Sequence, residues 1–91
     1  MRPAVVVAES SRDDWILCQV TSNPYGDPRA VSLPEASFRQ GTLHRKSYAR
    51  PGKLFTANRG LMIRQVGMLE PEAMRSIIDA VVELLRSGLK P

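Results

Sequence analysis

The chain has 91 residues, of which 43% are hydrophobic and 24% charged, and its formal net charge is +4. This length predicts one domain over residues 1–91 with a modest core, and it excludes a second core of ordinary size. One cysteine, Cys18, and one histidine exclude an intrachain disulfide and a structural zinc site. The absence of a long apolar stretch or a signal-peptide pattern predicts a cytoplasmic protein that binds no membrane.

The first two thirds of the chain predict short strands. Runs of β-branched and aromatic residues between polar, Gly-rich or Pro-rich segments are typical of strands. By this criterion strands are expected at residues 4–8, 15–21, 30–33, 43–49, 53–57 and 61–66. The segments between them predict turns at 22–28 and 58–60 and a single helical turn at 34–38. Cys18, Trp15 and Phe55 lie in apolar strand contexts, which predicts that they are buried.

One helix is expected at the end of the chain. Apolar residues recur at three- and four-residue spacing from Met74 to Leu85, which predicts an amphipathic helix over about 71–87. Pro71 suits the first helical position, and Gly88 suits the position just past the end. Strands over about 3–67 followed by one terminal helix predict a mainly β fold, a small barrel or curled sheet on which the helix packs.

The basic residues are unevenly distributed along the chain. No acidic residue stands between Glu35 and Glu70, whereas the rest of the chain carries six cations and nine acids. Uncompensated like charges on adjacent strands oppose folding, so this interval predicts a surface for a polyanion such as RNA. A solvated basic face without a ligand is the alternative. The seven cations of the interval are Arg39, Arg45, Lys46, Arg50, Lys53, Arg59 and Arg64.

The segment from Arg50 to Lys53 concentrates this charge. Pro51 followed by Gly52 fits the two central positions of a type II turn, which would bring the two flanking cations close together. A bulge in one continuous strand is the alternative, and it would also keep them near one another. Either arrangement predicts a contact with phosphate, and a simple hairpin corner without a ligand remains open.

Tyr25 and Tyr48 are candidates for stacking on unpaired bases, which single-stranded RNA recognition commonly uses. His44 is a candidate for proton transfer, because histidine titrates near neutral pH. A solvated histidine in a basic segment is the alternative reading of His44. Ser47 is a second candidate for a role in proton transfer.

Motifs of common hydrolases are missing. The chain contains no P-loop, no GxSxG, no HExxH and no paired-carboxylate motif. RNA cleavage requires less, because the 2′-hydroxyl of the substrate is itself the nucleophile. The protein needs only to accept a proton, stabilise the phosphorane and neutralise the leaving oxygen. Arginines together with a hydroxyl or a histidine can do this without a metal ion.

Several segments in order carry a resemblance to a known family. They are the start from Arg2 to Val7, the strand end Val20-Thr21-Ser22, Gly41-Thr42-Leu43 and the long run from Ser47 to Thr56, followed by 63–67 and the helix over 71–85. In this order and spacing they resemble the MazF/PemK family of toxin ribonucleases over nearly the whole chain. The resemblance implies an SH3-like barrel with a C-terminal helix.

The resemblance also implies a function. It implies the toxin component of a type II toxin–antitoxin system, an endoribonuclease that cleaves single-stranded RNA, including mRNA, to a 2′,3′-cyclic phosphate. It implies no metal and no cofactor, a homodimer, and an acidic antitoxin as partner. The alternative is a catalytically impaired or inactive barrel that binds RNA or the antitoxin.

Site residues follow from the resemblance together with the charge pattern. Arg2, Thr21 and Arg50 fall on the family's catalytic positions. For Arg2 a strand-end cation, and for Thr21 a strand terminator, remain the alternatives. The residues expected to bind RNA are His44, Arg45, Lys46, Ser47, Tyr48 and Lys53.

The chain departs from the family pattern at two points. Gly52 stands where the PemK branch has an acidic residue, so a general base is expected elsewhere. Family members carry a strand and a loop before the segment that begins here at Arg2. The barrel is therefore expected to lack its first strand, which leaves a sheet edge to be paired or covered.

Overall fold

A computed structural model describes residues 3–61 and 64–89 of the chain. The strands are β1 (Ala4–Glu9), β2 (Asp14–Thr21), β3 (Val31–Leu33), β4 (Phe38–Gly41), β5 (Ser47–Asn58) and β6 (Gly67–Leu69). Two short 3₁₀ turns, η1 (Glu35–Ser37) and η2 (Arg59–Leu61), interrupt them, and one helix, α1 (Pro71–Ser87), follows. The predicted class, mainly β with a C-terminal helix, is confirmed. Among the described residues no helix has both the length and the apolar character needed to cross a membrane.

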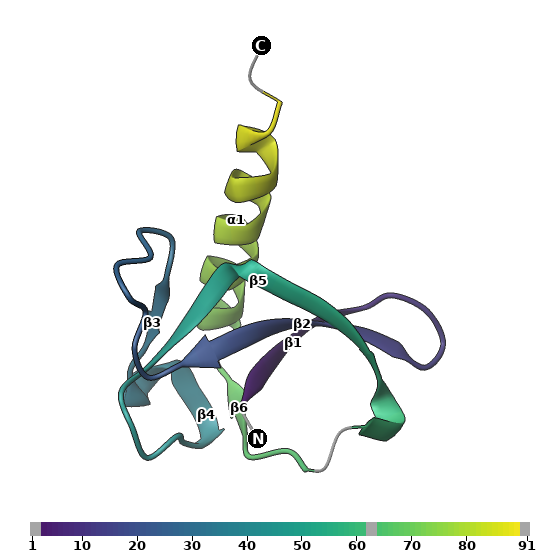
Figure 1. Cartoon of the computed structure of the whole chain (residues 1–91). Helices are drawn as coiled ribbons and strands as arrows, with labels where there is room; N and C mark the ends of the chain where they lie inside the picture. Colours follow the sequence, from purple (N-terminus) through teal and green to yellow (C-terminus); the bar gives the residue numbers. More distant parts are fainter. Residues whose placement is uncertain (1–2, 62–63, 90–91) are drawn as a thin grey trace.

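The strands form two antiparallel sheets. The larger sheet has the order β1-β2-β5-β3, and the smaller one pairs β4 with β6. Strand β5 bends sharply and gives the larger sheet its curl (Figure 1). Its first half pairs with β3 and with the end of β2, and its second half pairs with the rest of β2. The result is a half-barrel, in which β5 connects the two halves of the curved sheet.

The bend of β5 corrects two expectations about residues 43–57. The predicted type II turn at Pro51-Gly52 is wrong, and the bulge in a continuous strand is what the structure contains. Between the pairs Cys18–Leu54 and Val20–Ala49, a single residue of β2 lies opposite four residues of β5. Proline fits such a site because it has no N–H to donate to a neighbouring strand. Residues 43–46, expected to begin a strand over 43–49, form a loop instead.

The last predicted strand is also misplaced. It was expected at 61–66, but η2 ends at Leu61, residues 64–66 are irregular and β6 begins at Gly67; residues 62–63 lie outside the described part of the chain. The partner of β6 is β4 at Phe38–Gly41, for which the sequence carries no strand signal. This two-stranded sheet therefore forms through pairing between distant segments, which local propensity does not predict.

The core lies between the curved sheet and the helix. Its buried hydrophobic side chains are Leu17, Cys18, Val20, Leu33, Ala49 and Ile77. Cys18 is confirmed as a buried residue, and its thiol donates a hydrogen bond to the Arg50 carbonyl oxygen at 3.1 Å. Burial raises the pKa of this thiol, which keeps it neutral and unreactive. Phe55 was expected in the core and is 46% exposed, because it lies on the far half of β5 beyond the bend.

Helix α1 begins and ends as the sequence predicts. Pro71 is its first residue, and Gly88 is its C-cap. Ile77 is fully buried against the sheet. A Cβ atom at Gly52 would lie 3.5 Å from the Leu84 side chain, so the bend of β5 contacts the helix directly. The bend and the helix therefore support each other's position.

We expect Gly41→Ala to destabilise the protein more than Gly26→Ala. Both glycines have positive φ, +67° and +74°, so alanine costs about 1–2 kcal/mol of backbone strain at either site. At Gly41 the new Cβ would also overlap the Val66 carbonyl oxygen and lie 2.9 Å from Gly67 Cα, whereas nothing lies within 4 Å at Gly26. Urea denaturation of both variants measures the difference. Equal free energies of unfolding would contradict a tight β4–β6 contact.

Candidate nucleic-acid interface

Three strands align a row of polar side chains on the outer face of the sheet. Thr21 of β2 lies opposite Tyr48 of β5, and Tyr48 lies opposite Ser32 of β3. Successive side chains of a strand point to opposite faces, so the neighbours of this row face the core. Accordingly Val20 and Ala49 are buried, while Ser32 is exposed and Tyr48 is half-buried. The sheet therefore brings two predicted site residues, Thr21 and Tyr48, together.

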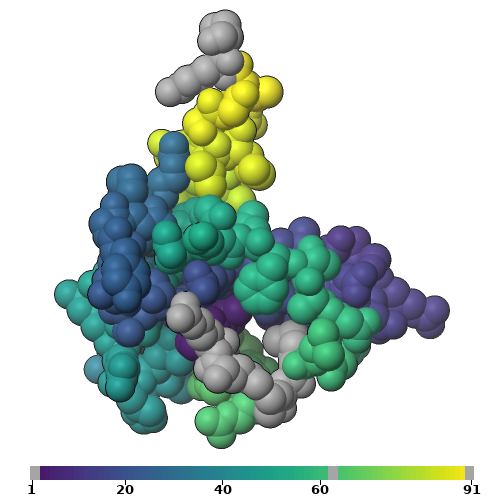
Figure 2. All heavy atoms as spheres, viewed as in Figure 1, coloured from purple at the N-terminus to yellow at the C-terminus, as the bar shows by residue number. Residues whose placement is uncertain are grey.

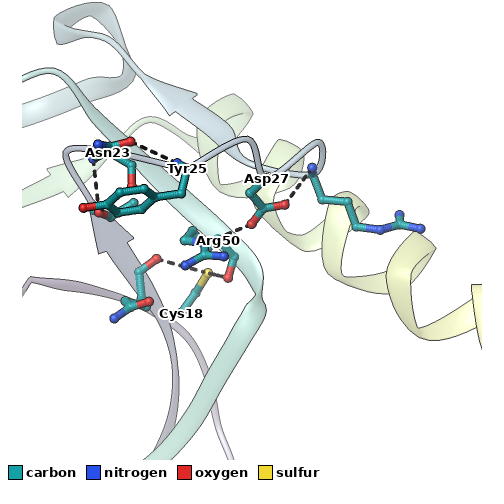
Figure 3. A network of polar contacts seen from close by, with 8 residues as sticks. Cys18, Asn23, Tyr25, Asp27 and Arg50 are labelled. Atoms are coloured by element: carbon teal, nitrogen blue, oxygen red, sulfur yellow. Dashed lines mark hydrogen bonds and ion pairs between the residues drawn. The ribbon is translucent and has the colours of Figure 1, made fainter.

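The hydroxyl of Thr21 anchors the loop that follows β2. It donates to the Asn23 carbonyl oxygen and accepts from the Asn23 N–H, both at 3.1 Å. The Asn23 side chain in turn accepts from the Tyr25 N–H at 3.0 Å. Tyr25, which follows this contact in the loop (Figure 3), is at positive φ and is 80% exposed, so it is open to a ligand base. Thr21 thus ends its strand and also sets the course of the loop over 22–30.

Arg50 is held by an acid of this loop. Its Nε–H donates to Asp27 Oδ2 at 3.0 Å, and the two side chains are 24% and 14% exposed. Figure 3 shows the two side chains pointing toward one another from β5 and from the loop. Among the described residues, the two terminal nitrogens of Arg50 have no hydrogen-bond acceptor. Asp27 therefore fixes the orientation of the guanidinium group and leaves donors for a further anion.

The hydrogen bond from Arg50, supported by the Arg29 N–H at 2.9 Å, holds the pKa of Asp27 below its usual range. The expectation that the seven central cations are uncompensated is thus wrong for Arg50. It is also wrong for Arg39, which forms an exposed ion pair with Glu70 at 3.4 Å. The folded chain thus pairs these two cations with acidic residues from outside the interval.

We expect Asp27→Asn to destabilise the protein at neutral pH and to have little effect in acid. The pKa of Asp27 is lowered in the folded chain, so the ion pair contributes fully above the ordinary value of 3.8. That contribution is lost as the pH falls through the lowered pKa. The difference in free energy of unfolding should be about 1–2 kcal/mol at pH 7, and urea titrations from pH 7 to pH 2 measure it. Glu70→Gln is the matched control, because its exposed pair contributes less than about 1 kcal/mol.

The basic loop over 44–46 lies next to the row of polar side chains, because Ser32 of that row and the loop line the same hollow. A surface hollow of about 450 Å³ is lined by Ser32 together with Leu33, Pro34, Glu35, Thr42, Leu43, His44, Arg45 and Lys46. His44, Arg45 and Lys46 are all exposed. Since Ser32 pairs with Tyr48, the hollow opens next to the row that begins at Thr21. These residues together form one surface, which we call the β5 face: Thr21, Ser32, Tyr48, Arg50 and the loop His44–Lys46.

Two of the predicted site residues, Ser47 and Lys53, lie outside the β5 face. Ser47 is 4% exposed and faces the core, where its hydroxyl donates to the Arg45 carbonyl oxygen at 2.8 Å. This hydrogen bond therefore fixes the backbone of the basic loop at Arg45 from the core side. Lys53 is exposed at the end of the bulge in β5. Arg2 lies outside the described residues; the next residue, Pro3, accepts a hydrogen bond from the Val20 N–H at 3.2 Å.

Sequence reasoning missed two residues of this region. Ser32 alternates with the half-buried Val31 and the buried Leu33, and this polar–apolar pattern is the one signal that it faces outward. Asp27 carries no such signal, because it lies in a turn and its partner Arg50 is 23 residues away in the sequence. The described residues contain no cluster of three or more His, Cys, Asp or Glu side chains placed to hold a metal ion.

Comparison with known proteins identifies the fold. No family model matches the chain, and no curated protein matches it. Among solved structures, an "Endoribonuclease from Mycobacterial species" is similar over 92% of this chain and 79% of its own, with a TM-score of 0.74 and 16% sequence identity. An endoribonuclease is the class of protein that the resemblance to the MazF/PemK family implies. At this identity the likeness establishes the architecture, and the chain has the fold of this mycobacterial endoribonuclease.

Proposed function

We propose that the chain is an endoribonuclease that cuts single-stranded RNA, including mRNA, and requires neither a metal ion nor a cofactor. The observation that carries the proposal is the cross-strand pair of Thr21 and Tyr48, with Arg50 two residues further along the same strand. These three residues place a hydroxyl, an aromatic ring and a guanidinium group on one face. The fold shared with a mycobacterial endoribonuclease supports the same function.

The reaction assigns a task to each group. The 2′-hydroxyl oxygen attacks the adjacent phosphorus, the bond from phosphorus to the 5′-oxygen breaks, and a 2′,3′-cyclic phosphate and a 5′-hydroxyl result. Arg50, already oriented by Asp27, would stabilise the extra charge of the phosphorane through its free nitrogens. Thr21 would turn its hydroxyl proton from the Asn23 carbonyl oxygen to a phosphate oxygen, and Tyr48 would stack on a base.

Proton transfer completes the proposed mechanism. One group must accept the proton of the 2′-hydroxyl, and another must donate a proton to the leaving 5′-oxygen. His44 lines the hollow of the β5 face and is the candidate base, while Arg2 is the candidate acid or phosphorane-stabilising cation. Arg45, Lys46 and Lys53 would bind the flanking phosphates.

The partner proposed for this enzyme is an acidic antitoxin, which would make the chain the toxin of a type II toxin–antitoxin pair. The net charge of +4 and the exposed cations of the loop over 44–46 support an acidic partner. An acidic segment seated on these cations would compete with RNA. Binding of the protein product of the adjacent gene, measured with and without a single-stranded RNA competitor, tests this.

A second candidate function is RNA binding without cleavage. Two observations favour it. Ser47, a candidate for proton transfer, faces the core, and Gly52 stands where the family resemblance implies an acidic residue. The β5 face would then hold RNA through Tyr48 and its cations, with no base aligned on the 2′-hydroxyl.

Incubation of an end-labelled single-stranded RNA with the protein in EDTA separates the two functions. The enzyme should release fragments ending in a 2′,3′-cyclic phosphate, and Thr21→Val and Arg2→Ala should each abolish their release. Arg12→Ala, in the exposed loop between β1 and β2, should cut normally. Binding without cutting would support the second candidate, and absence of binding would contradict both.

A further inference from the structure

One acidic side chain lies in the hollow of the β5 face, beside cations that favour an anion. Glu35, the first residue of η1, lines this hollow of about 450 Å³ together with Arg45 and Lys46. All three residues are exposed. A carboxylate weakens the binding of a phosphate at the same place, because like charges repel. Glu35 therefore indicates that a part of the nucleotide other than its phosphate occupies the hollow.

The hollow also has apolar lining that is fixed by the fold. The side chains of Leu33 and Leu43 line it, and both belong to or pack against the buried core cluster. The backbone at Glu35 is held as well, because its carbonyl oxygen accepts a hydrogen bond from the Phe38 N–H. Fixed apolar side chains next to a few polar groups are typical of a site for a flat ring, such as a nucleobase.

The carboxylate of Glu35 is available to such a ring. Among the described residues it forms no ion pair and no side-chain hydrogen bond. A carboxylate accepts hydrogen bonds through two oxygens side by side. Guanine alone among the RNA bases has two adjacent donors, N1–H and the N2 amino group, on its Watson–Crick edge. Adenine and cytosine place a ring-nitrogen acceptor next to the amino group, and uracil has a single donor between two carbonyl oxygens.

We propose that the hollow binds one guanine base of the RNA, and that Glu35 accepts hydrogen bonds from its N1–H and N2 amino group. This inference rests on the proposed function, because it identifies the nucleotide that the β5 face selects. Arg45 and Lys46 bind the flanking phosphates. His44 lines the same hollow, so the 2′-hydroxyl of this guanosine is the one nearest to the candidate base. The chain then cuts on the 3′ side of guanosine.

The affinity for short RNAs tests the choice of base. A labelled oligouridine with one central 2′-deoxyguanosine keeps the guanine base but lacks the attacking hydroxyl at that nucleotide. Fluorescence anisotropy should give it a Kd about tenfold lower than that of the same strand with 2′-deoxyadenosine, as expected for one bidentate contact. 2′-Deoxyinosine, which lacks the N2 amino group, should bind with intermediate affinity. Equal affinities for the guanine and adenine strands would overturn the proposal, and binding to neither strand would contradict the nuclease function as well.

A substitution tests the role of Glu35. Glu35→Gln should bind the guanine and adenine strands with equal affinity, because its amide offers one donor and one acceptor in place of two acceptors. Glu9→Gln is the matched control and should keep the preference. Glu9 is exposed at the end of β1, and the loop that follows it lies on the opposite side of the molecule from the loop over 42–46 (Figures 1 and 2). A preference for guanine that survives in Glu35→Gln would overturn the assignment.

The position of the cuts separates this inference from the nuclease function. With unmodified RNA, the fragments should end in guanosine 2′,3′-cyclic phosphate, which mass spectrometry identifies. Cuts that occur equally after all bases would overturn the guanine site and leave the nuclease function in place. Selective binding of the guanine strand without any cutting of unmodified RNA would support the guanine site and contradict the nuclease function alone.

Discussion

Replacing Ile77 with alanine should lower the free energy of unfolding by about 2–5 kcal/mol, which is the usual cost of emptying a fully buried site. Ile77 is 0% exposed, and it belongs to the same buried cluster as Cys18, Val20, Leu33 and Ala49 of the sheet. The packing of Ile77 therefore holds α1 against the curved sheet. Since small domains are stable by only about 5–15 kcal/mol, this one change would remove a large share of the stability.

Ile78→Ala is the matched control for this prediction. It removes the same atoms from the next residue of the same helix, but Ile78 is 40% exposed. We expect Ile78→Ala to lower the free energy of unfolding by less than about 1 kcal/mol. Urea denaturation measures both variants. Equal losses would contradict the assignment of the Ile77 side of α1 as the face that packs on the sheet.

Replacing Arg50 with alanine should reduce the rate of RNA cleavage about 100-fold or more, the usual effect of removing one donor that stabilises developing charge. Arg50→Lys should restore only part of the rate, because lysine has no planar fork to bind Asp27 and a phosphate together. Single-turnover cleavage of a labelled RNA gives the rate constant of each variant.

Arg39→Ala controls for the loss of an ion-paired arginine. Arg39 also pairs with an acid, Glu70, but it lies on β4 and outside the β5 face. Its loss should leave the cleavage rate within about threefold of the wild type, since exposed pairs contribute little to stability. A slow Arg39→Ala variant, or a fast Arg50→Ala variant, would remove Arg50 from the proposed mechanism.

The elements that the sequence predicts correctly are those with a strong local signal. The β-branched run over 4–8 and the apolar run over 15–21 become β1 and β2, and the periodic stripe becomes α1. The resemblance to a ribonuclease family points to the same architecture as the solved mycobacterial structure.

The errors arise where distant contacts override local propensity. Pro51-Gly52 has the composition of a hairpin turn, but Pro51 is buried and Gly52 approaches Leu84 of the helix, so the chain bends there without reversing. The sequence also cannot show that Asp27 neutralises Arg50, because neither residue carries a local sign of the other. The charge of the candidate site is therefore set by the fold.

Photo-crosslinking of a single-stranded RNA that contains 4-thiouridine tests the central claim most directly, because it locates the RNA on the protein. If the β5 face is the binding surface, the crosslinked peptides should contain Tyr48 and the loop His44–Lys46. Excess unlabelled RNA should abolish these crosslinks. Crosslinks confined to α1, or to the loop between β1 and β2, would contradict the claim that RNA lies on the β5 face.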